Sequence, residues 1–498
     1  MDDWAELDRA IGEIAASGSA EVREDGEWLA ELAGLHCELR HEGPHSLVHL
    51  WSEDRNLTRR ILGVKERSDG RVVLEVRRFG RAKPGRLEFV RTDSPRAAGR
   101  ITREQFRARF RRILCERFPD ATIETLTTAP DLEYSFSGLY VRGRMHEGPL
   151  AWALLAVSSG ENAATVEGIL TFGILWLDWT RSRAESRAIH GLRLFVPEGM
   201  SRALRERVLG LSSAIRVEVY EFDETEARIY RTDPADAGNL QSWLIPRSQT
   251  ESVLGLAGDA VARVRSFLPG TPGKSDVIAA RVIPGTDDLA FGFRGLEFAC
   301  WSAGQILFGL GDSRQRLAKE TEGSLARLLS QLDLHRNSLA QDVKHPLYRA
   351  APERWLETLL LEDPSRLDAQ LDPRFLYSQV PALAASDRGV LDLLGVTRRG
   401  RLVVIELKAA EDIQLLMQAV DYWLRVRRHQ RDGDFQQYGY FSGIELDPAP
   451  PLVWLVAPGL RFHPVTEILL RYLSPEIRVT RIGLNENWRR GPRVIFRQ

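Results

Sequence analysis

Apolar and polar positions alternate along the chain in short runs that are typical of a mixed α/β protein. Runs of Val, Ile and Leu bounded by Gly and polar turns predict strands, and apolar positions three and four residues apart predict helices. After a helical start, this pattern predicts a β-rich domain up to residue 96, with strands in HSLVHLW and RLEFV. Residues 236–345 carry turn and linker signals, a strand pair in DDLAFGFRGLEFACW and a long helix from about Arg314 to Leu334.

Residues 97–235 and 346–498 show the same order of predicted elements: a helix, three strands, a helix, a strand, a helix and a strand. The similarity extends to the residues, because GLRLFVPEG and IRVEVYEF match PLVWLVAPG and IRVTRIGL in character. Such a match indicates an internal duplication. Aligning the hairpins YVRGRMHEG and GVTRRG places Gly138, Ala156 and Ser158 where the second copy has Asp392, Glu406 and Lys408.

Two predicted strands of the second copy, GVLDLLGV and RLVVIELKA, carry charges inside apolar runs. If Arg398, Arg399 and Gly400 form a three-residue hairpin loop, Asp392 lies opposite Glu406, and the two-residue period places Lys408 on the same face. Burying a charge is costly unless something pairs with it. A structural ion pair of Lys408 with either carboxylate is one explanation.

A divalent cation is the other explanation, since it would relieve the repulsion between two facing carboxylates. Mg²⁺ or Mn²⁺ suits an oxygen-only site of one or two carboxylates, completed by water and substrate phosphate. Lys408 would then hold or deprotonate a water that attacks a phosphodiester. Because the aligned first copy lacks these charges, we expect them to serve chemistry rather than the fold.

The ordered set of motifs resembles the PD-(D/E)XK nuclease superfamily and, within it, the catalytic domain of NucS-type DNA endonucleases. It spans about residues 350–430 and comprises Glu357 in WLETLLLEDP, the strand residue Gln379, Asp392 in DLL, VIELK and Gln418 in QAVDYW. The resemblance implies a restriction-endonuclease-like fold in the last domain, preceded by a degenerate copy.

By position, the resemblance also implies roles for individual residues. Asp392, Glu406 and the carbonyl of Leu407 would bind the metal, and Lys408 would orient the water. Glu357 would reach the metal through water, and Gln418 would hold Lys408 or the scissile phosphate. Residues 1–340 have no recognised counterpart, so no substrate specificity is transferred.

The expected activity is that of a Mg²⁺-dependent DNA endonuclease, in DNA repair or in defence against foreign DNA. A ribonuclease with the same chemistry remains open. So does a non-cleaving nucleic-acid-binding or scaffold protein with a vestigial nuclease domain. A homodimer or a partner protein is also left open by the sequence.

Charge is distributed unevenly, although the formal net charge is only −1. Residues 1–54 carry 3 basic and 14 acidic side chains, whereas residues 55–117 carry 20 basic and 7 acidic ones. The basic segment therefore either binds a polyanion such as DNA or packs against the acidic start of the chain.

The cellular compartment is inferred from segments that the sequence lacks. There is no apolar run of about 18 residues and no charged-then-apolar leader, so we expect neither a membrane span nor a signal peptide. Cys37, Cys115 and Cys300 are widely spaced, which argues against disulfides or a zinc site and favours buried thiols. These features predict a cytoplasmic protein.

Overall fold

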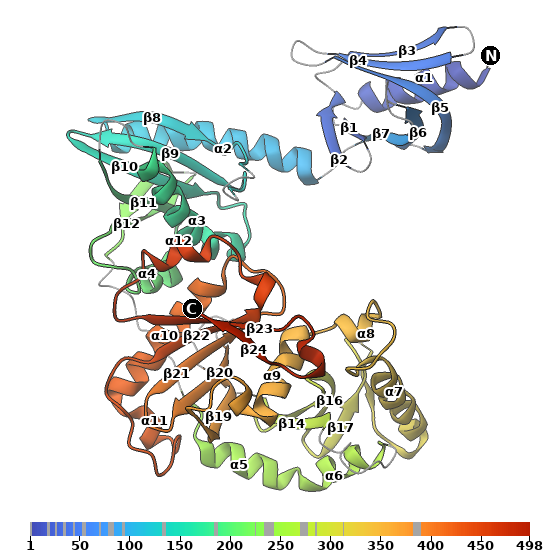
Figure 1. Cartoon of the computed structure of the whole chain (residues 1–498). Helices are drawn as coiled ribbons and strands as arrows, with labels where there is room; N and C mark the ends of the chain where they lie inside the picture. Colours follow the sequence, from blue (N-terminus) through green and yellow to red (C-terminus); the bar gives the residue numbers. More distant parts are fainter. Residues whose placement is uncertain are drawn as a thin grey trace. The chain divides into compact units, whose positions relative to one another are not determined.

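The structure is a computed structural model of the whole chain. It divides into two compact units, residues 1–112 and 113–498, which are described separately (Figure 1). The residues outside the described parts are 1, 17–19, 25–26, 33–35, 43–44, 52–55, 69–70, 78–83, 92–94, 132–135, 184–187, 225, 234–243, 269–276, 284–285, 312 and 382–389.

The first unit is a sheet of seven strands covered by one helix. The helix, α1 (Asp2–Ala16), buries Leu7, Ile11 and Ile14 in the core of the sheet. Their spacing of three and four residues gives α1 one apolar side. The strands are β1 (Ala20–Glu24), β2 (Glu27–Glu31), β3 (His36–Glu42), β4 (His45–Trp51), β5 (Asn56–Ser68), β6 (Arg71–Arg77) and β7 (Gly85–Arg91).

Part of the basic segment does pair with the acidic start of the chain. Arg67 of β5 lies 2.8 Å from Glu6 of α1, and Arg59 of β5 lies 2.7 Å from Glu24 of β1. Other basic residues are placed differently: Arg60 of β5 and Arg77 of β6 lie directly opposite each other in the sheet. Like charges in that position repel each other.

The second unit begins with a six-stranded sheet of order β13-β12-β11-β10-β9-β8. Asn162 caps the helix α3 (Ala163–Ser182), because its side chain accepts a 2.9 Å hydrogen bond from the Thr165 N–H. The elements are α2 (Pro95–Arg117), which starts in the first unit, β8 (Ala121–Thr127), β9 (Tyr140–Glu147), β10 (Leu150–Val157), α3 (Ala163–Ser182), β11 (Ile189–Pro197), α4 (Arg202–Val208), β12 (Arg216–Asp223) and β13 (Arg228–Arg231).

A second six-stranded sheet, of order β19-β20-β21-β22-β23-β24, follows near the end of the chain. Its parallel and antiparallel pairings repeat those of the first: only β21–β22–β23 and β10–β11–β12 are parallel. The elements are α9 (Pro352–Glu362), β19 (Leu371–Pro381), β20 (Val390–Thr397), β21 (Leu402–Leu407), α10 (Leu415–Asp432), α11 (Asp434–Gln437), β22 (Leu452–Pro458), α12 (Thr466–Leu470), β23 (Arg478–Leu484) and β24 (Val494–Arg497).

Residues between these sheets form a domain with a sheet of its own, where the sequence predicted a strand pair and a linker. Five antiparallel strands lie in chain order, and α7 starts at Glu322 rather than near Arg314, because a short strand and a helical turn come first. The elements are α5 (Arg247–Leu256), α6 (Gly258–Ser266), β14 (Ile278–Val282), β15 (Leu289–Phe293), β16 (Leu296–Ser302), β17 (Gln305–Phe308), β18 (Gln315–Arg316), α7 (Glu322–His335) and α8 (Pro346–Arg349).

Arg336 fixes this five-stranded sheet to the start of α9. The side chain is fully buried, and it donates hydrogen bonds to the carbonyls of Phe293 and Arg294 and to those of Leu347, Ala350 and Ala351. Burial, together with the nearby Arg489 and Arg294, lowers the Arg336 pKa to about 9. Gly295 closes the contact, since a Cβ there would clash with the backbone of Arg354 in α9.

The two six-stranded sheets share one hydrophobic core, formed by α3 and α4 on one side and α10 and α12 on the other (Figure 1). The contact also includes a buried ion pair, in which Arg207 of α4 donates to both carboxylate oxygens of Asp421 in α10 at 2.8 Å. Residues 346–498 share this core with residues 121–231 and have another of their own, on the α9 side of their sheet, around Trp355 and Trp488.

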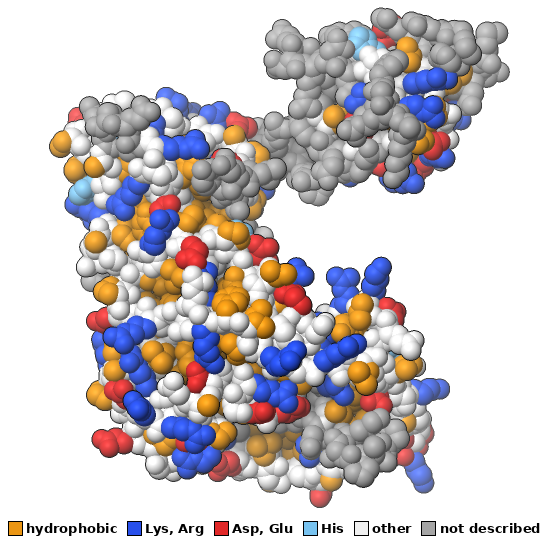
Figure 2. Space-filling view, viewed as in Figure 1, with side chains coloured by type: hydrophobic (Ala, Val, Ile, Leu, Met, Phe, Trp, Pro, Cys, Tyr) orange, Lys and Arg blue, Asp and Glu red, His pale blue; other side chains and the backbone are white. Residues whose placement is uncertain are grey.

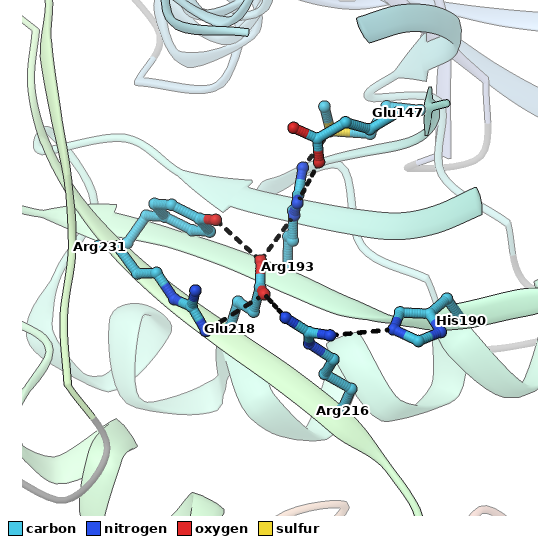
Figure 3. A network of polar contacts seen from close by, with 8 residues as sticks. Glu147, His190, Arg193, Arg216, Glu218 and Arg231 are labelled. Carbon is cyan, nitrogen blue, oxygen red and sulfur yellow. Dashed lines mark hydrogen bonds and ion pairs between the residues drawn. The ribbon is translucent and has the colours of Figure 1, made fainter. Parts of the chain in front are cut away.

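A polar network lies on the other face of the first sheet (Figure 3). Arg193 of β11 is 2.9 Å from Glu218 of β12 and 2.5 Å from Glu147 of β9. Burial alone would raise the pKa of Glu218, but the hydrogen bond from Tyr220 and the nearby arginines leave this pKa below its usual range. The network satisfies a charged pair inside the domain, as buried charges require.

Two further expectations concern the cysteines and the membrane. The three cysteines are free thiols, as expected, but only Cys300 is buried; Cys37 is partly buried and Cys115 is exposed. Burial and the neighbouring Asp8 raise the pKa of Cys37 to about 12. Within the described parts of the chain, none of the helices is long and apolar enough to cross a membrane.

Candidate functional site

The β20–β21 hairpin has the predicted three-residue loop. Thr397 N–H donates to Arg401 O at 2.8 Å, and Gly400 has a φ of +83°, in the left-handed region that such loops need. The strands continue in register through Leu393 and Ile405. The next step along the hairpin brings Asp392 opposite Glu406.

Asp392, Glu406 and Lys408 come together at the end of this hairpin. Lys408 Nζ lies 4.0 Å from Glu406 Oε1 and 3.2 Å from Asp412 Oδ2. Asp392 Oδ2 accepts a 3.0 Å hydrogen bond from the Leu407 N–H. The three predicted residues therefore share one site, and Asp412 joins them.

Glu406 is the least solvated member of the site. Its side chain is only 4% exposed, and its Oε2 is buried with no hydrogen-bond partner. Burial, with the nearby Asp392 carboxylate, raises the Glu406 pKa well above its usual range, and burial also raises the Asp392 pKa. A buried carboxylate oxygen without a donor is an available ligand for a cation.

The Lys408 ammonium is held in its charged form. Burial alone would lower the Lys408 pKa, but the Glu406 and Asp412 carboxylates more than offset this, so the pKa is raised. At neutral pH the free protein therefore presents a hydrogen-bond donor at Lys408. A lysine in this state orients a water rather than deprotonating it.

Leu407, the last residue of β21, lies between Glu406 and Lys408, and its side chain lies in the core beside α9. Lys408 N–H donates to Val456 O of β22 at 3.0 Å, while the Leu407 N–H donates to Asp392. Since N–H and C=O of one strand residue point to the same side, the Leu407 carbonyl is turned toward Asp392. This orientation fits the ligand role expected of that carbonyl.

Glu357 reaches the site from α9, and it brings Arg354, which the sequence interpretation missed. Arg354 Nη1 lies 2.7 Å from Glu357 Oε2 and 3.9 Å from Asp392 Oδ1. Burial raises the pKa of Glu357 despite this ion pair. Arg354 precedes Glu357 by three residues, so helical periodicity already places both on one side of α9.

Gln418 of α10 is on the side of that helix that faces α3 and α4. It lines a cavity of about 180 Å³ between α3, α4 and α10, together with Gly168, Arg207 and Tyr422. Its Oε1 is buried without a hydrogen-bond partner, so no bond to Lys408 forms through that atom. The side chain of Gln379, the strand glutamine of the motif, lies outside the described residues.

A cleft of about 340 Å³ adjoins the site on its α9 side. It lies between β14 and β15 of the five-stranded sheet and α9 and β19. Its basic lining residues are Arg247, Arg281 and Arg354, and Glu357 lines it too. The five-stranded sheet thus supplies one wall of this cleft, and α9, with Arg354 and Glu357, supplies another.

Some basic residues at the end of α10 form contacts within the domain, and others are exposed to solvent. His429 is buried and lies 2.5 Å from Asp434, and Arg427 donates to the carbonyl of Pro448 at 2.8 Å. Arg428 and Arg431 remain more than two-fifths exposed. On the face of residues 113–498 drawn in Figure 2, Lys and Arg side chains are spread among acidic and apolar ones.

The residues of the first copy that were expected to correspond to the site are wrong. Ala156 and Ser158, expected as counterparts of Glu406 and Lys408, are each one residue too far along the chain, and Gly138, expected as the counterpart of Asp392, is four residues too early. Pro197 and Pro458 end β11 and β22, and their pairing with β10 and β21 makes Leu155 the counterpart of Glu406. Leu155 pairs with Arg142, which is therefore the counterpart of Asp392. By the same count Val157, not Ser158, corresponds to Lys408, and Ala156 faces the other side of the sheet, as Leu407 does.

The first copy has no pair of facing carboxylates at these positions. Arg142 is buried, donates to the carbonyls of Ser137 and Ala129, and lies 4.7 Å from the ring centre of Phe136 and 5.6 Å from that of Trp176. A buried cation between aromatic rings stands where the second copy has Asp392. The corrected alignment thus keeps the contrast between the copies.

Among the described residues, no three His, Cys, Asp or Glu side chains are grouped so that they could hold a metal ion. The site offers two facing carboxylates, one with an oxygen that lacks a donor, and a backbone carbonyl turned toward them. An oxygen-only set of this size suits Mg²⁺ or Mn²⁺, which keep several waters. It does not suit zinc, which prefers nitrogen and sulfur ligands.

Comparisons with known proteins add no family: no protein-family model matches the chain, and no curated protein matches it.

Proposed function

We propose that the chain is a Mg²⁺- or Mn²⁺-dependent endonuclease that hydrolyses phosphodiester bonds of DNA, with a restriction-endonuclease-like last domain. The observation that carries the proposal is the arrangement of Asp392, Glu406 and Lys408 at one end of the β20–β21 hairpin. It includes a buried Glu406 oxygen with no donor. Most buried polar atoms have a hydrogen-bond partner, and a bound cation would satisfy this one.

Each residue has a part in the proposed reaction. Asp392, Glu406 and the Leu407 carbonyl would hold the divalent cation, which supplies Lewis-acid stabilisation of the phosphate when bound. The charged Lys408 would orient the attacking water. Arg354 is placed to leave its ion pair with Glu357 and to neutralise a phosphate at the mouth of the cleft.

The proposal is supported by the contrast between the two copies. Both sheets have the same strand order and pairing, so the fold forms without these carboxylates. The charged set costs folding free energy because its carboxylates are poorly solvated. A cost that the fold does not require points to a chemical role.

The test is a cleavage assay of the purified chain with Mg²⁺, and separately with Mn²⁺, on supercoiled plasmid, single-stranded DNA, branched DNA and RNA. Chelation by EDTA and the Asp392→Ala variant are the controls. We expect metal-dependent cleavage of DNA that both controls remove. Cleavage at the wild-type rate by Asp392→Ala would overturn the assignment, and activity confined to RNA would replace DNA as the substrate.

A further inference from the structure

The two repeats, residues 121–231 and 346–498, here called the two halves, are related by a local twofold axis. At its centre, Leu211 and Leu473 form an antiparallel bridge. Ser212 N–H donates to Tyr472 O at 3.0 Å, and Ser474 N–H donates to Gly210 O at 2.9 Å. The two hydrogen bonds are equivalent: exchanging the two halves converts the first into the second.

The residues at this bridge are structural counterparts. In both halves the serine carbonyl accepts a 3.0 Å hydrogen bond from the N–H three residues later, Ile215 or Ile477, just before β12 or β23. The same segment therefore contacts itself across the axis. Such a contact is isologous, the kind that joins the subunits of a symmetric dimer.

The helices on either side of the bridge follow the same symmetry. Helix α3 is the counterpart of α10, and α4 is the counterpart of α12. Helix α10 packs on α4, and α3 packs on α12, so the two contacts are equivalent. The apolar side chains of all four helices form one core. Within the described residues, the degenerate half thus occupies the face through which a second catalytic half would pair.

Catalytic groups are present in one half alone. The counterparts of Asp392, Glu406 and Lys408 are Arg142, Leu155 and Val157, which bind no divalent cation. The two strands of a DNA duplex are themselves related by twofold axes, so a symmetric protein dimer addresses both strands equivalently. This chain has the twofold arrangement of a symmetric dimer, but only one of its two halves has the catalytic groups.

We infer that the protein is a nicking enzyme, which hydrolyses one strand of a duplex in each binding event. This inference rests on the proposed function. The degenerate half takes the place of the second subunit and makes the arrangement intramolecular. A single chain then forms the twofold arrangement without a second copy. Because it has one set of catalytic groups, cutting the other DNA strand requires a second binding event.

The experiment follows supercoiled plasmid with time in Mg²⁺, with the full chain limiting, and runs single-stranded DNA in parallel. We expect nicked circles to accumulate first and linear DNA to appear only after a lag. Adding an excess of the Asp392→Asn chain should slow both products through competition for DNA and leave their order unchanged.

The outcomes separate the inference from the proposed function. Linear DNA that forms from the start, in parallel with nicked circles, would overturn the inference while supporting hydrolysis of DNA. Cleavage of single strands without cleavage of plasmid would do the same. If neither substrate is cut with Mg²⁺ or Mn²⁺, the proposed function fails and the inference fails with it.

Discussion

The backbone N–H of Leu407 donates to Asp392 Oδ2 at 3.0 Å, across the end of the β20–β21 hairpin. This bond holds one oxygen of Asp392 and leaves the other, Oδ1, near Arg354 on the open side of the site. The carboxylate is thus oriented by the strand itself. The β20–β21 hairpin fixes the position of Asp392. A substitution of the Asp392 side chain therefore tests its chemical role and leaves the hairpin in place.

Substitution of the site residues should remove activity and preserve the fold. We expect Asp392→Ala and Glu406→Ala to reduce DNA cleavage to background, because each removes a ligand of the cation. Circular dichroism and thermal melting should show a folded chain. The matched control is Glu411→Ala, a half-exposed carboxylate 3.8 Å from His463, which should cleave like wild type. Unchanged activity in Asp392→Ala would show that the carboxylates are structural.

Lys408→Arg tests the compact ammonium separately from its charge. Arginine keeps the positive charge, but its planar group is larger and does not take the same position. We expect the single-turnover cleavage rate to fall by about 10²-fold, the scale of loss when a group that positions a reactant is displaced by about 1 Å. Lys344→Arg, at an exposed position, is the control. A rate equal to wild type would mean that only the charge of Lys408 matters.

Glu406→Gln should stabilise the metal-free protein at neutral pH. Because the folded-state pKa of Glu406 is raised, the wild-type side chain contributes stability below its usual pKa, and this contribution is lost as the pH rises through the raised value. Glutamine does not titrate. Urea unfolding at several pH values should therefore show a difference in favour of the variant that grows with pH. A constant difference would contradict the raised pKa.

Gly210→Val tests the contact between the two halves. A Cβ at Gly210 would clash with the side chain of Val420 in α10. Overpacking of this kind typically costs about 1–3 kcal/mol, so the free energy of unfolding should fall by that amount. Gly323→Val in α7 is the matched control, since no atom lies within 4 Å of its added Cβ. Equal stability of the two variants would show that the halves are loosely joined.

Arg60 and Arg77 test whether the first unit contacts DNA. They lie opposite each other in the sheet, an arrangement that a bound polyanion would favour. If both contact phosphates of a duplex, the double variant Arg60→Gln/Arg77→Gln should reduce the slope of log affinity against log salt by about 0.9 per lost contact. Arg67→Gln, which removes the partner of Glu6, is the control. An unchanged slope would assign these arginines to the sheet alone.

The hairpin of the candidate site could be predicted from the sequence because its signals are local. Gly400 marks the left-handed position, and the strand period then places Asp392, Glu406 and Lys408 on one face. The counterpart of this hairpin could not be aligned in the same way. Its strands are joined by the two residues Gly148 and Pro149, one fewer than in β20–β21, so the register shifts along β9 and β10.

Other features depend on tertiary packing and escaped the sequence interpretation. The edge strands β13 and β24 are four residues each, too short for a periodic signal. The five-stranded sheet was expected as a strand pair because β17 and β18 are only four and two residues long, and because β14 closely follows the turn-rich stretch PGTPGKSD. The contact of Arg354 with Asp392 joins an α-helix to a strand, and no sequence pattern specifies that approach.

Arg336 and Gly295 join the five-stranded sheet to the first turn of α9, the helix that carries Arg354 and Glu357. Helix α9 is therefore positioned by residues that precede the α/β fold to which it belongs. A shortened chain that began at α9 would keep the hairpin and lose the hydrogen bonds that fix the direction of its helix. The minimal functional fragment thus extends upstream of the sequence repeat, and a duplication of the repeat alone would copy a fold without copying the support of its site.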